Sequence, residues 1–121
     1  MNNKILVVED SHDTSNALKI LFEYNKFSVI QCFESQQALD IAKQSKPGLI
    51  ILDFMMPGLS GKDVLVMLKQ DPKTKDIPVI MLTAKTDALK TNAALKACDK
   101  FMTKPFDNKE VLKEAKKLLS R

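Results

Sequence analysis

Short apolar runs alternate along the chain with longer segments in which apolar residues recur every three or four positions. The runs predict strands at Lys4–Val8, Ser28–Cys32, Leu49–Leu52, Ile77–Leu82 and Lys100–Thr103. The first, third and fourth runs are apolar almost throughout and do not alternate with polar residues. That pattern is typical of strands buried on both faces, as in a parallel sheet covered by helices.

The segments between the runs have the period of amphipathic helices. We expect helices over about residues 12–25, from a cap at Ser35 to Pro47-Gly48, over about 60–70 and 86–97, and from Asp107 or Asn108 to Arg121. The residues predicted to face the core include Ala17, Leu18, Leu21 and Phe22 in the first helix and Val111, Leu112, Ala115, Leu118 and Leu119 in the last.

Five strand–helix units with right-handed crossovers predict a doubly wound, three-layer α/β sandwich. We expect a five-stranded parallel sheet in the order 2-1-3-4-5 with five helices, which is the flavodoxin-like arrangement. In such sheets the functional groups gather beyond the carboxyl ends of the strands, at the point where the strand order reverses.

Polar residues stand where four of the five predicted strands end. Glu9 and Asp10 follow the first strand, Asp53 the third, Thr83 the fourth and Lys104 the fifth. In the order 2-1-3-4-5 the first and third strands are neighbours. The three carboxylates are therefore predicted to converge, with the threonine and the lysine on the other side of the same pocket.

Three carboxylates in one pocket repel one another and are costly to desolvate unless a cation compensates them. Oxygen ligands suit Mg²⁺, which is usually held by one or two carboxylates together with phosphate oxygens. Lys104 supplies a positive charge for a second phosphate oxygen, and Thr83 supplies a hydroxyl donor for a third. One carboxylate remains free to attack phosphorus, so the residues indicate a Mg²⁺-assisted aspartyl-phosphate site.

The same residues carry a family resemblance that extends over essentially residues 3–120. The matching motifs are Ile5-Leu6-Val7-Val8-Glu9-Asp10, Asp53-Phe54-Met55-Met56-Pro57-Gly58, Met81-Leu82-Thr83-Ala84 and Lys104-Pro105-Phe106. In this order the chain resembles the receiver domain of two-component response regulators, and in particular the single-domain chemotaxis type.

The resemblance implies which groups hold the phosphoryl group and the metal ion. Asp53 corresponds to the phosphoacceptor, charged by a phosphohistidine on a sensor histidine kinase or a histidine phosphotransfer protein. Asp10, Asp53 and the backbone carbonyl of Met55 correspond to the Mg²⁺ ligands, and Glu9 to the acid that acts through a bound water.

The resemblance also implies a switch. Thr83 corresponds to the hydroxyl drawn toward the phosphoryl group, and Lys104 to the lysine that pairs with a phosphoryl oxygen. Phe101 falls at the aromatic switch position, and the Lys104–Pro105 peptide is expected to be cis. Together these groups imply a phosphorylation-activated switch that changes the surface formed by the fourth helix, fifth strand and fifth helix.

Two departures from the family pattern bear on this reading. Ala97 stands where the family usually has glycine before the fifth strand, so the turn there must avoid positive φ or accept strain. Met55 and Lys85 occupy the positions that flank the path of the attacking water in the family. Because a thioether orients water poorly, we expect slow autodephosphorylation and no enzymatic activity beyond the domain's own phosphoryl transfer.

Charge changes the picture only at the carboxyl-terminal end. The net charge is +4, yet 18 of the 19 basic residues are Lys and only 6% of residues are aromatic, which argues against direct nucleic-acid binding. Residues 1–84 carry a net −1 and residues 85–121 a net +5. This is either a solvated lysine-rich surface or a face for an acidic partner or self-association, with candidates Lys90, Lys96, Lys100 and Lys109.

The chain of 121 residues has the length of one domain. No apolar run suits a membrane span or a secretory signal, so a cytoplasmic protein without membrane insertion is expected. Cys32 and Cys98 are expected to be reduced and mostly buried. We expect residues 1–121 to form a single receiver domain with no output domain, either stand-alone or part of a longer protein.

Other functions fit the sequence less well. A phosphohydrolase with an aspartate nucleophile is one alternative, but the haloacid-dehalogenase-like group of such enzymes needs a second Asp where Met55 stands. The segment Gly58–Asp63 resembles a phosphate-binding loop but has the wrong spacing, and it is expected to be a turn into the third helix. A phosphate-independent interaction module with a receiver fold remains the alternative.

Overall fold

The computed structural model describes residues 2–83 and 98–120. One parallel sheet has the order β2-β1-β3-β4-β5, as predicted. Its strands are β1 (Lys4–Val8), β2 (Ser28–Cys32), β3 (Leu49–Asp53), β4 (Val79–Thr83) and β5 (Lys100–Thr103). All four pairings between neighbouring strands are parallel. The predicted flavodoxin-like sandwich is therefore confirmed.

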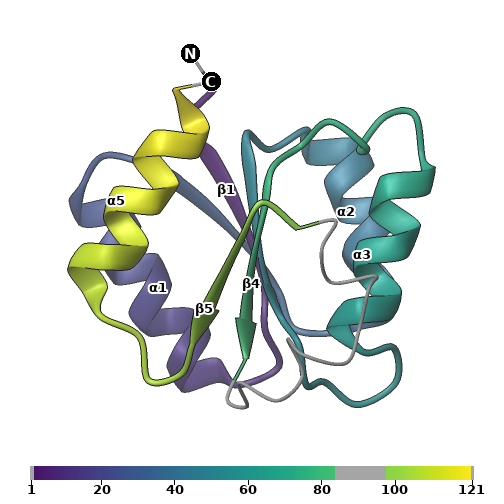
Figure 1. Ribbon diagram of the computed structural model, residues 1–121, viewed down its shortest axis with the longest axis horizontal. Helices are drawn as coiled ribbons and strands as arrows, with labels where there is room; N and C mark the ends of the chain where they lie inside the picture. The colour runs from purple at the N-terminus through teal and green to yellow at the C-terminus, as the bar shows by residue number, and fades with distance from the viewer. Residues whose placement is uncertain (1, 84–97, 121) are drawn as a thin grey trace.

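The helices are α1 (His12–Tyr24), α2 (Ala38–Ser45), α3 (Gly61–Gln70) and α5 (Asn108–Leu119), and a 3₁₀ turn η1 (Ser35–Gln37) precedes α2. Figure 1 shows α1 and α5 on one face of the sheet and α2 and α3 on the other. The helix predicted over 86–97 lies outside the described residues. Lys85, Lys90, Lys96 and Ala97 lie in the same part of the chain.

The core consists of two apolar clusters, one on each face of the sheet. Successive side chains of a strand point to opposite faces, so each buried strand supplies both clusters. In β1, Ile5 and Val7 join the cluster under α1 and α5, whereas Leu6 and Val8 join the one under α2 and α3. Every residue of β3 and β4 is buried, as the apolar runs predicted.

Local capping fixes where the helices begin. The Ser11 side chain accepts a hydrogen bond from the Thr14 N–H at the start of α1, and Asp107 does the same for Lys109 at the start of α5. At α3, Ser60 and Asp63 cap each other reciprocally. The segment Gly58–Asp63 is thus the predicted turn into the third helix.

Some local predictions were wrong. β3 ends at Asp53 and β4 at Thr83, each one residue later than predicted. β4 begins at Val79 rather than Ile77, because the Ile77 N–H bonds the Thr74 carbonyl and stays in the preceding turn. Ser35 does not cap a helix; it opens η1, and its hydroxyl lies 3.2 Å from the Pro57 carbonyl. Ala17 is exposed, because the buried stripe of α1 runs through Ser15, Leu18 and Phe22 and lies a fraction of a turn away.

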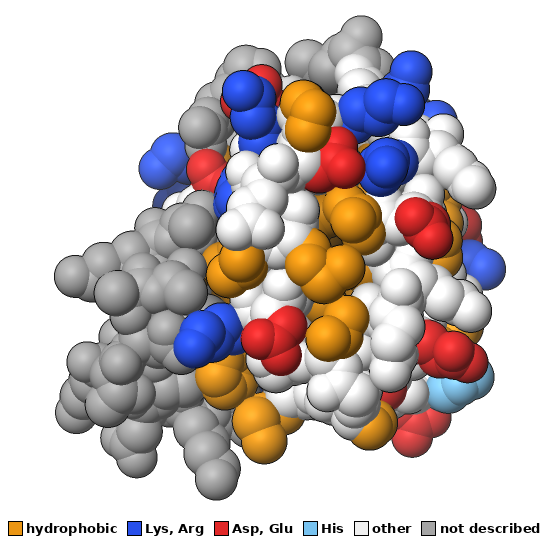
Figure 2. Space-filling view, turned by 90° about the vertical axis from the view of Figure 1, so that its right-hand side faces the viewer, with side chains coloured by type: hydrophobic (Ala, Val, Ile, Leu, Met, Phe, Trp, Pro, Cys, Tyr) orange, Lys and Arg blue, Asp and Glu red, His pale blue; other side chains and the backbone are white. Residues whose placement is uncertain are grey.

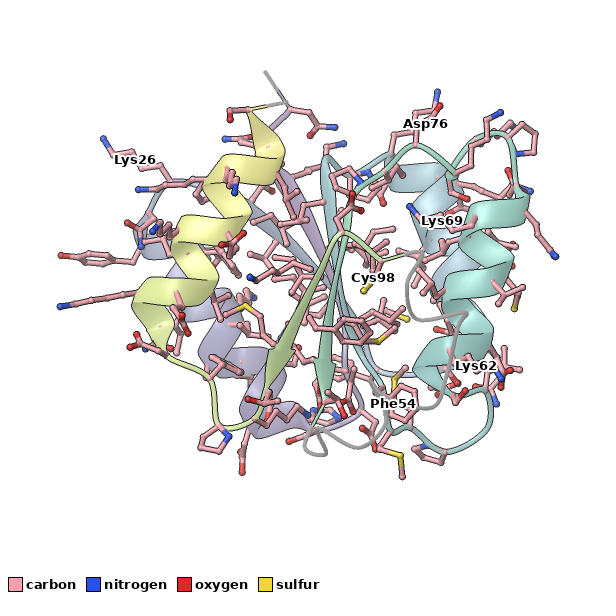
Figure 3. The ribbon with its side chains drawn as sticks, viewed as in Figure 1. Lys26, Phe54, Lys62, Lys69, Asp76 and Cys98 are labelled. Atoms are coloured by element: carbon pink, nitrogen blue, oxygen red, sulfur yellow. The ribbon has the colours of Figure 1, made fainter. Side chains whose placement is uncertain are left out.

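The end of the molecule opposite the carboxyl ends of the strands is tied together by the first residues of the chain. The side-chain amides of Asn2 and Asn3 donate to the carbonyls of Lys46 and Lys26, at 2.8 and 3.0 Å. Both lysines have left-handed backbone conformations, with φ of 49° and 70°. In Figure 3, Lys26 and Asp76 lie toward this end, away from Phe54.

The outer surface of α2 and α3 is partly apolar. Figure 2 shows a row of hydrophobic side chains on this face with charged side chains on both sides. A shallow depression there is lined by Leu39, Met67, Gln70, Asp71 and Pro72. No helix in the described part of the chain is both long and apolar enough to cross a membrane.

Candidate functional site

The predicted acidic cluster forms where β1 and β3 end side by side. β1 pairs with β3 up to Val8 and Leu52, so the next residues of the two strands emerge at one edge of the sheet. Carboxylate oxygens of Glu9, Asp10 and Asp53 all lie within 4.8 Å of one another. In Figure 3, Phe54, which follows Asp53, lies at this edge of the molecule.

A single lysine links two of the three acids. Lys104 Nζ lies 3.0 Å from Glu9 Oε2 and 3.0 Å from Asp53 Oδ1. Glu9 and Asp53 are buried, at 1% and 4% exposure, and Asp10 is half-buried. One ammonium group therefore faces three carboxyl groups, which leaves the cluster with excess negative charge.

Burial sets the protonation behaviour of this cluster. It raises the pKa of Asp53, against the hydrogen bond and charge of Lys104, and the charge of Asp10 raises that pKa further. The pKa of Glu9 is also raised, first by burial and then by the charge of Asp53, again opposed by Lys104. A bound cation would relieve both the repulsion and the cost of burial.

Lys104 stays charged in this setting. Burial lowers its pKa, but the hydrogen bonds to Asp53 and Glu9 outweigh burial, and the pKa is raised overall. Its backbone N–H donates to the Thr83 carbonyl at 2.8 Å, which ties the end of β5 to the end of β4. The Lys104–Pro105 peptide is cis, as expected.

The loop after β3 is held close to Asp53 from both sides. The Phe54 N–H donates to the Leu82 carbonyl at 2.8 Å, and the Gly61 N–H donates to the Phe54 carbonyl at 2.9 Å. A Cβ at Gly61 would collide with the backbone of Asp53 and Phe54, so only glycine fits at the start of α3. Met55 donates its N–H to the Asp53 carboxylate, whereas its side chain is 57% exposed.

The predicted switch residues lie on β4, which is next to the strand of Asp53, and on β5, which follows β4 at the edge of the sheet. Thr83 is the last residue of β4 and is fully buried. Phe101 lies in β5 opposite Met81, half-buried, and packs against the core on the α2 and α3 side. Thr83 thus lies on the strand between that of Asp53 and that of Phe101.

Sequence reasoning missed the residues that seat the loops around the cluster. These are Gly61, Ser35 with its contact to Pro57, and the stacked rings of His12 and Phe33. His12 is exposed at the start of α1, two residues after Asp10. A glycine directly after a helix-capping serine was the available signal for Gly61; contacts between distant loops leave none.

The donor set fits a hard divalent cation. Within the described residues the cluster offers carboxylate oxygens and no sulfur or imidazole ligand. Oxygen-only sites of this kind suit Mg²⁺, whereas thiolates and imidazoles favour zinc and copper. The half-buried Asp10 and the excess negative charge leave the cluster able to hold such an ion.

The chain is similar in sequence to known signalling proteins. Residues 5–116 match the sequence profile of the response regulator receiver domain. The alkaline phosphatase synthesis transcriptional regulatory protein PhoP of Bacillus subtilis (strain 168) is 38% identical over 122 residues, covering 100% of this chain and 50% of that protein. The chain spans about half the length of the curated relatives it matches.

Solved structures share the fold. The signal receiver domain of a signal transduction histidine kinase from Syntrophus aciditrophicus superposes with a TM-score of 0.89 at 32% identity, covering 98% of this chain and 90% of that one. The receiver domain of a sensor histidine kinase from Pseudomonas aeruginosa PAO1 has a TM-score of 0.91 at 21% identity, with full coverage of both chains. That domain was solved with a magnesium ion in its active site cleft.

Proposed function

The chain belongs to the response regulator receiver domain family, and on that premise we propose that it is a switch activated by phosphorylation of Asp53. The observation that carries the proposal is the Lys104 ammonium group, which lies 3.0 Å from both Glu9 and Asp53 within the acidic cluster. It places a fixed positive charge beside the carboxylate that is to receive the phosphoryl group.

In the proposed reaction an Asp53 carboxylate oxygen attacks the phosphorus of a phosphohistidine. The new P–O bond forms as the P–N bond breaks, and the donor's imidazole leaves with the bonding electrons. Lys104 pairs with a phosphoryl oxygen and offsets its charge. Mg²⁺, held by Asp10, Asp53 and the Met55 carbonyl with Glu9 acting through water, would supply charge neutralisation on the phosphoryl oxygens.

The donor in this proposal is a sensor histidine kinase or a histidine phosphotransfer protein, and the site of action is the cytoplasm. The domain catalyses only its own phosphorylation and a slow loss of the phosphoryl group. The exposed thioether of Met55 supports slow hydrolysis, because it offers no strong hydrogen bond to an attacking water. A phosphoryl half-life of minutes or longer is expected; a half-life of seconds in Mg²⁺ buffer contradicts this point.

The proposed output runs from Thr83 through Phe101 to the surface around β5 and α5. The phosphoryl group adds up to two negative charges and new acceptor oxygens for the Thr83 hydroxyl. Lys100 and Lys109 are exposed on that surface, and Lys100 lies 3.9 Å from Glu114. An acidic partner or a second copy of the chain would bind there in a phosphorylation-dependent manner.

Acetyl phosphate as a small phosphoryl donor tests the chemistry. Intact mass spectrometry in Mg²⁺ buffer should show one added phosphoryl group on the wild type and none on Asp53→Asn. Asp40→Asn, which changes an exposed acid of α2, should accept the group like the wild type. An equal mass increase in Asp53→Asn contradicts Asp53 as the acceptor. No mass increase in the wild type contradicts the proposal and favours a phosphate-independent interaction module.

A further inference from the structure

The segment between β2 and α2 supplies no proposed Mg²⁺ ligand, but it contacts residues that lie close in sequence to the ligands. The residues after β1 carry Glu9 and Asp10, and the loop after β3 carries Met55. The segment Phe33–Gln36, which joins β2 to α2, contacts His12 at the start of α1, two residues after Asp10, and the loop after β3, each through a different side chain. We call it the β2–α2 brace.

The first contact is a stack of two rings. His12 and Phe33 have ring centroids 4.0 Å apart and planes inclined by only 6°. His12 is the first residue of α1, two positions after Asp10. The Glu9 N–H also donates at 3.0 Å to the carbonyl of Cys32, the last residue of β2, so the acidic pair is tied to the residue directly before the brace as well.

The second contact seats the loop that follows Asp53. The hydroxyl of Ser35, which is 2% exposed, donates to the Pro57 carbonyl at 3.2 Å, a shorter contact than its 3.4 Å approach to Gln36 Oε1. Beside it, the Gln36 side chain lies so close to Gly58 that a Cβ there would collide. Gly58 has a φ of +82°, which glycine adopts without strain.

We propose that the β2–α2 brace sets the Mg²⁺ affinity of the site by fixing the positions of the two ligand-bearing segments, after β1 and after β3, relative to each other. This inference rests on the proposed function. Ligands held in their bound geometry lose less conformational entropy when the ion binds. His12, Phe33 and Ser35 are positioning residues in this scheme, because they act through Asp10 and through the loop containing Met55.

The test is a Mg²⁺ titration of the full chain at fixed pH, in which amide NMR shifts measure the affinity. His12→Ala and Ser35→Ala should each weaken Mg²⁺ binding by roughly threefold to tenfold, below the roughly 10- to 100-fold typical of residues bonded directly to metal ligands. His12→Phe keeps a ring against Phe33 and should retain wild-type affinity. Both variants remove the imidazole, but only His12→Ala removes the stacked ring. Comparing the two therefore separates the effect of ring stacking from that of the imidazole group.

A matched control lies at the opposite end of the sheet. Asn2→Ala removes a loop hydrogen bond of 2.8 Å and should lower thermal stability while leaving Mg²⁺ affinity unchanged. Equal affinities in the wild type, His12→Ala and Ser35→Ala overturn the brace alone. Equal losses of Mg²⁺ affinity in His12→Ala and His12→Phe also overturn the brace. Absence of Mg²⁺ binding in the wild type overturns the proposed function as well.

Should Ser35→Ala fail to fold, the exposed His12 keeps the proposal testable. His12→Ala and His12→Phe alter a surface ring, so both are expected to fold. Their difference in Mg²⁺ affinity then decides the outcome, and Phe33→Ala should match His12→Ala because it removes the other half of the same stack.

Discussion

At the residue scale, the charge of Asp53 has the largest effect on the electrostatics of the site. Its carboxylate is buried beside Glu9 and Asp10 and is compensated only in part by Lys104. Buried charges are costly unless fully paired, so the metal-free protein stores an unfavourable interaction at this position. The same excess negative charge is what attracts a divalent cation.

Replacing Asp53 by Asn should stabilise the metal-free protein. The amide keeps the shape and can accept from Lys104, but removes a buried negative charge, so we expect a gain of about 1–2 kcal/mol in the free energy of unfolding at neutral pH. Urea denaturation in the presence of a chelator measures this gain. A destabilised Asp53→Asn would mean that the Lys104 pairing outweighs the repulsion.

The pH dependence of that gain has a defined sign. The folded-state pKa of Asp53 is raised, so its protonated form favours folding below the ordinary pKa, and this contribution is lost as pH rises through the raised value. The gain from Asp53→Asn should therefore be largest at neutral pH and shrink as pH falls toward ~4. A gain that grows on acidification would contradict the assigned direction.

The two cysteines should react slowly in the folded protein. Burial, with help from the Asp99 charge, raises the pKa of Cys98 to about 11, and burial raises that of Cys32. Since the thiolate is the nucleophile, labelling of Cys98 by a disulfide reagent at pH 8 should accelerate by roughly 100-fold on unfolding, and labelling of Cys32 should accelerate as well. Cys32 is buried as expected, whereas Cys98 is only half-buried. Cys32→Ser and Cys98→Ser assign the rates to each thiol; fast labelling of either in the native state would contradict its raised pKa.

At the scale of elements, the sequence predicted what hydrophobic period and capping determine. Three strands, β1, β2 and β5, have the predicted bounds. The start of β4 was misjudged because Ile77 is apolar yet is bonded in a turn. Ser35 looks like a helix cap in sequence, but its partner, Pro57, comes from a loop far along the chain, and local pattern carries no information on such contacts.

The backbone at the end of α2 is strained, and a substitution can relieve that strain. Lys46 ends this helix in the left-handed region, with φ 49° and ψ 60°, where an L side chain is disfavoured. Lys46→Gly should therefore raise the free energy of unfolding by roughly 0.5–1 kcal/mol. Gln44→Gly, within the same helix, should lower it by about 1 kcal/mol. If both substitutions destabilise the protein equally, the strain is relieved in some other way.

At the scale of the whole molecule, the strand order determines which residues meet at the site. It places β1 and β3 side by side, so that acids distant in sequence share one cluster, and it brings Lys104, which follows β5, to meet them. The polar residues that end apolar strands made this cluster predictable. The loops that support it were not predictable, because ring stacking and loop seating depend on tertiary approach.

Mg²⁺ binding should join β1 to β3 and so stabilise the whole fold. A ligand that binds only the folded state at a hundredfold excess over its Kd contributes ~2.7 kcal/mol. Thermal unfolding of the wild type should shift upward with Mg²⁺, and Asp10→Asn should lose most of the shift. Asp40→Asn, on the exposed side of α2, should keep it. An unchanged shift in Asp10→Asn would place the ion elsewhere.

The most direct test of the switch is amide NMR of the Mg²⁺-loaded protein titrated with beryllofluoride, a stable mimic of the phosphoryl group. We predict shifts at Asp53, Thr83, Phe101 and α5 in the wild type and none of these in Asp53→Asn. Shifts confined to the acidic cluster, or a response that persists in Asp53→Asn, would contradict the claim that phosphorylation of Asp53 is transmitted to the β5 and α5 surface.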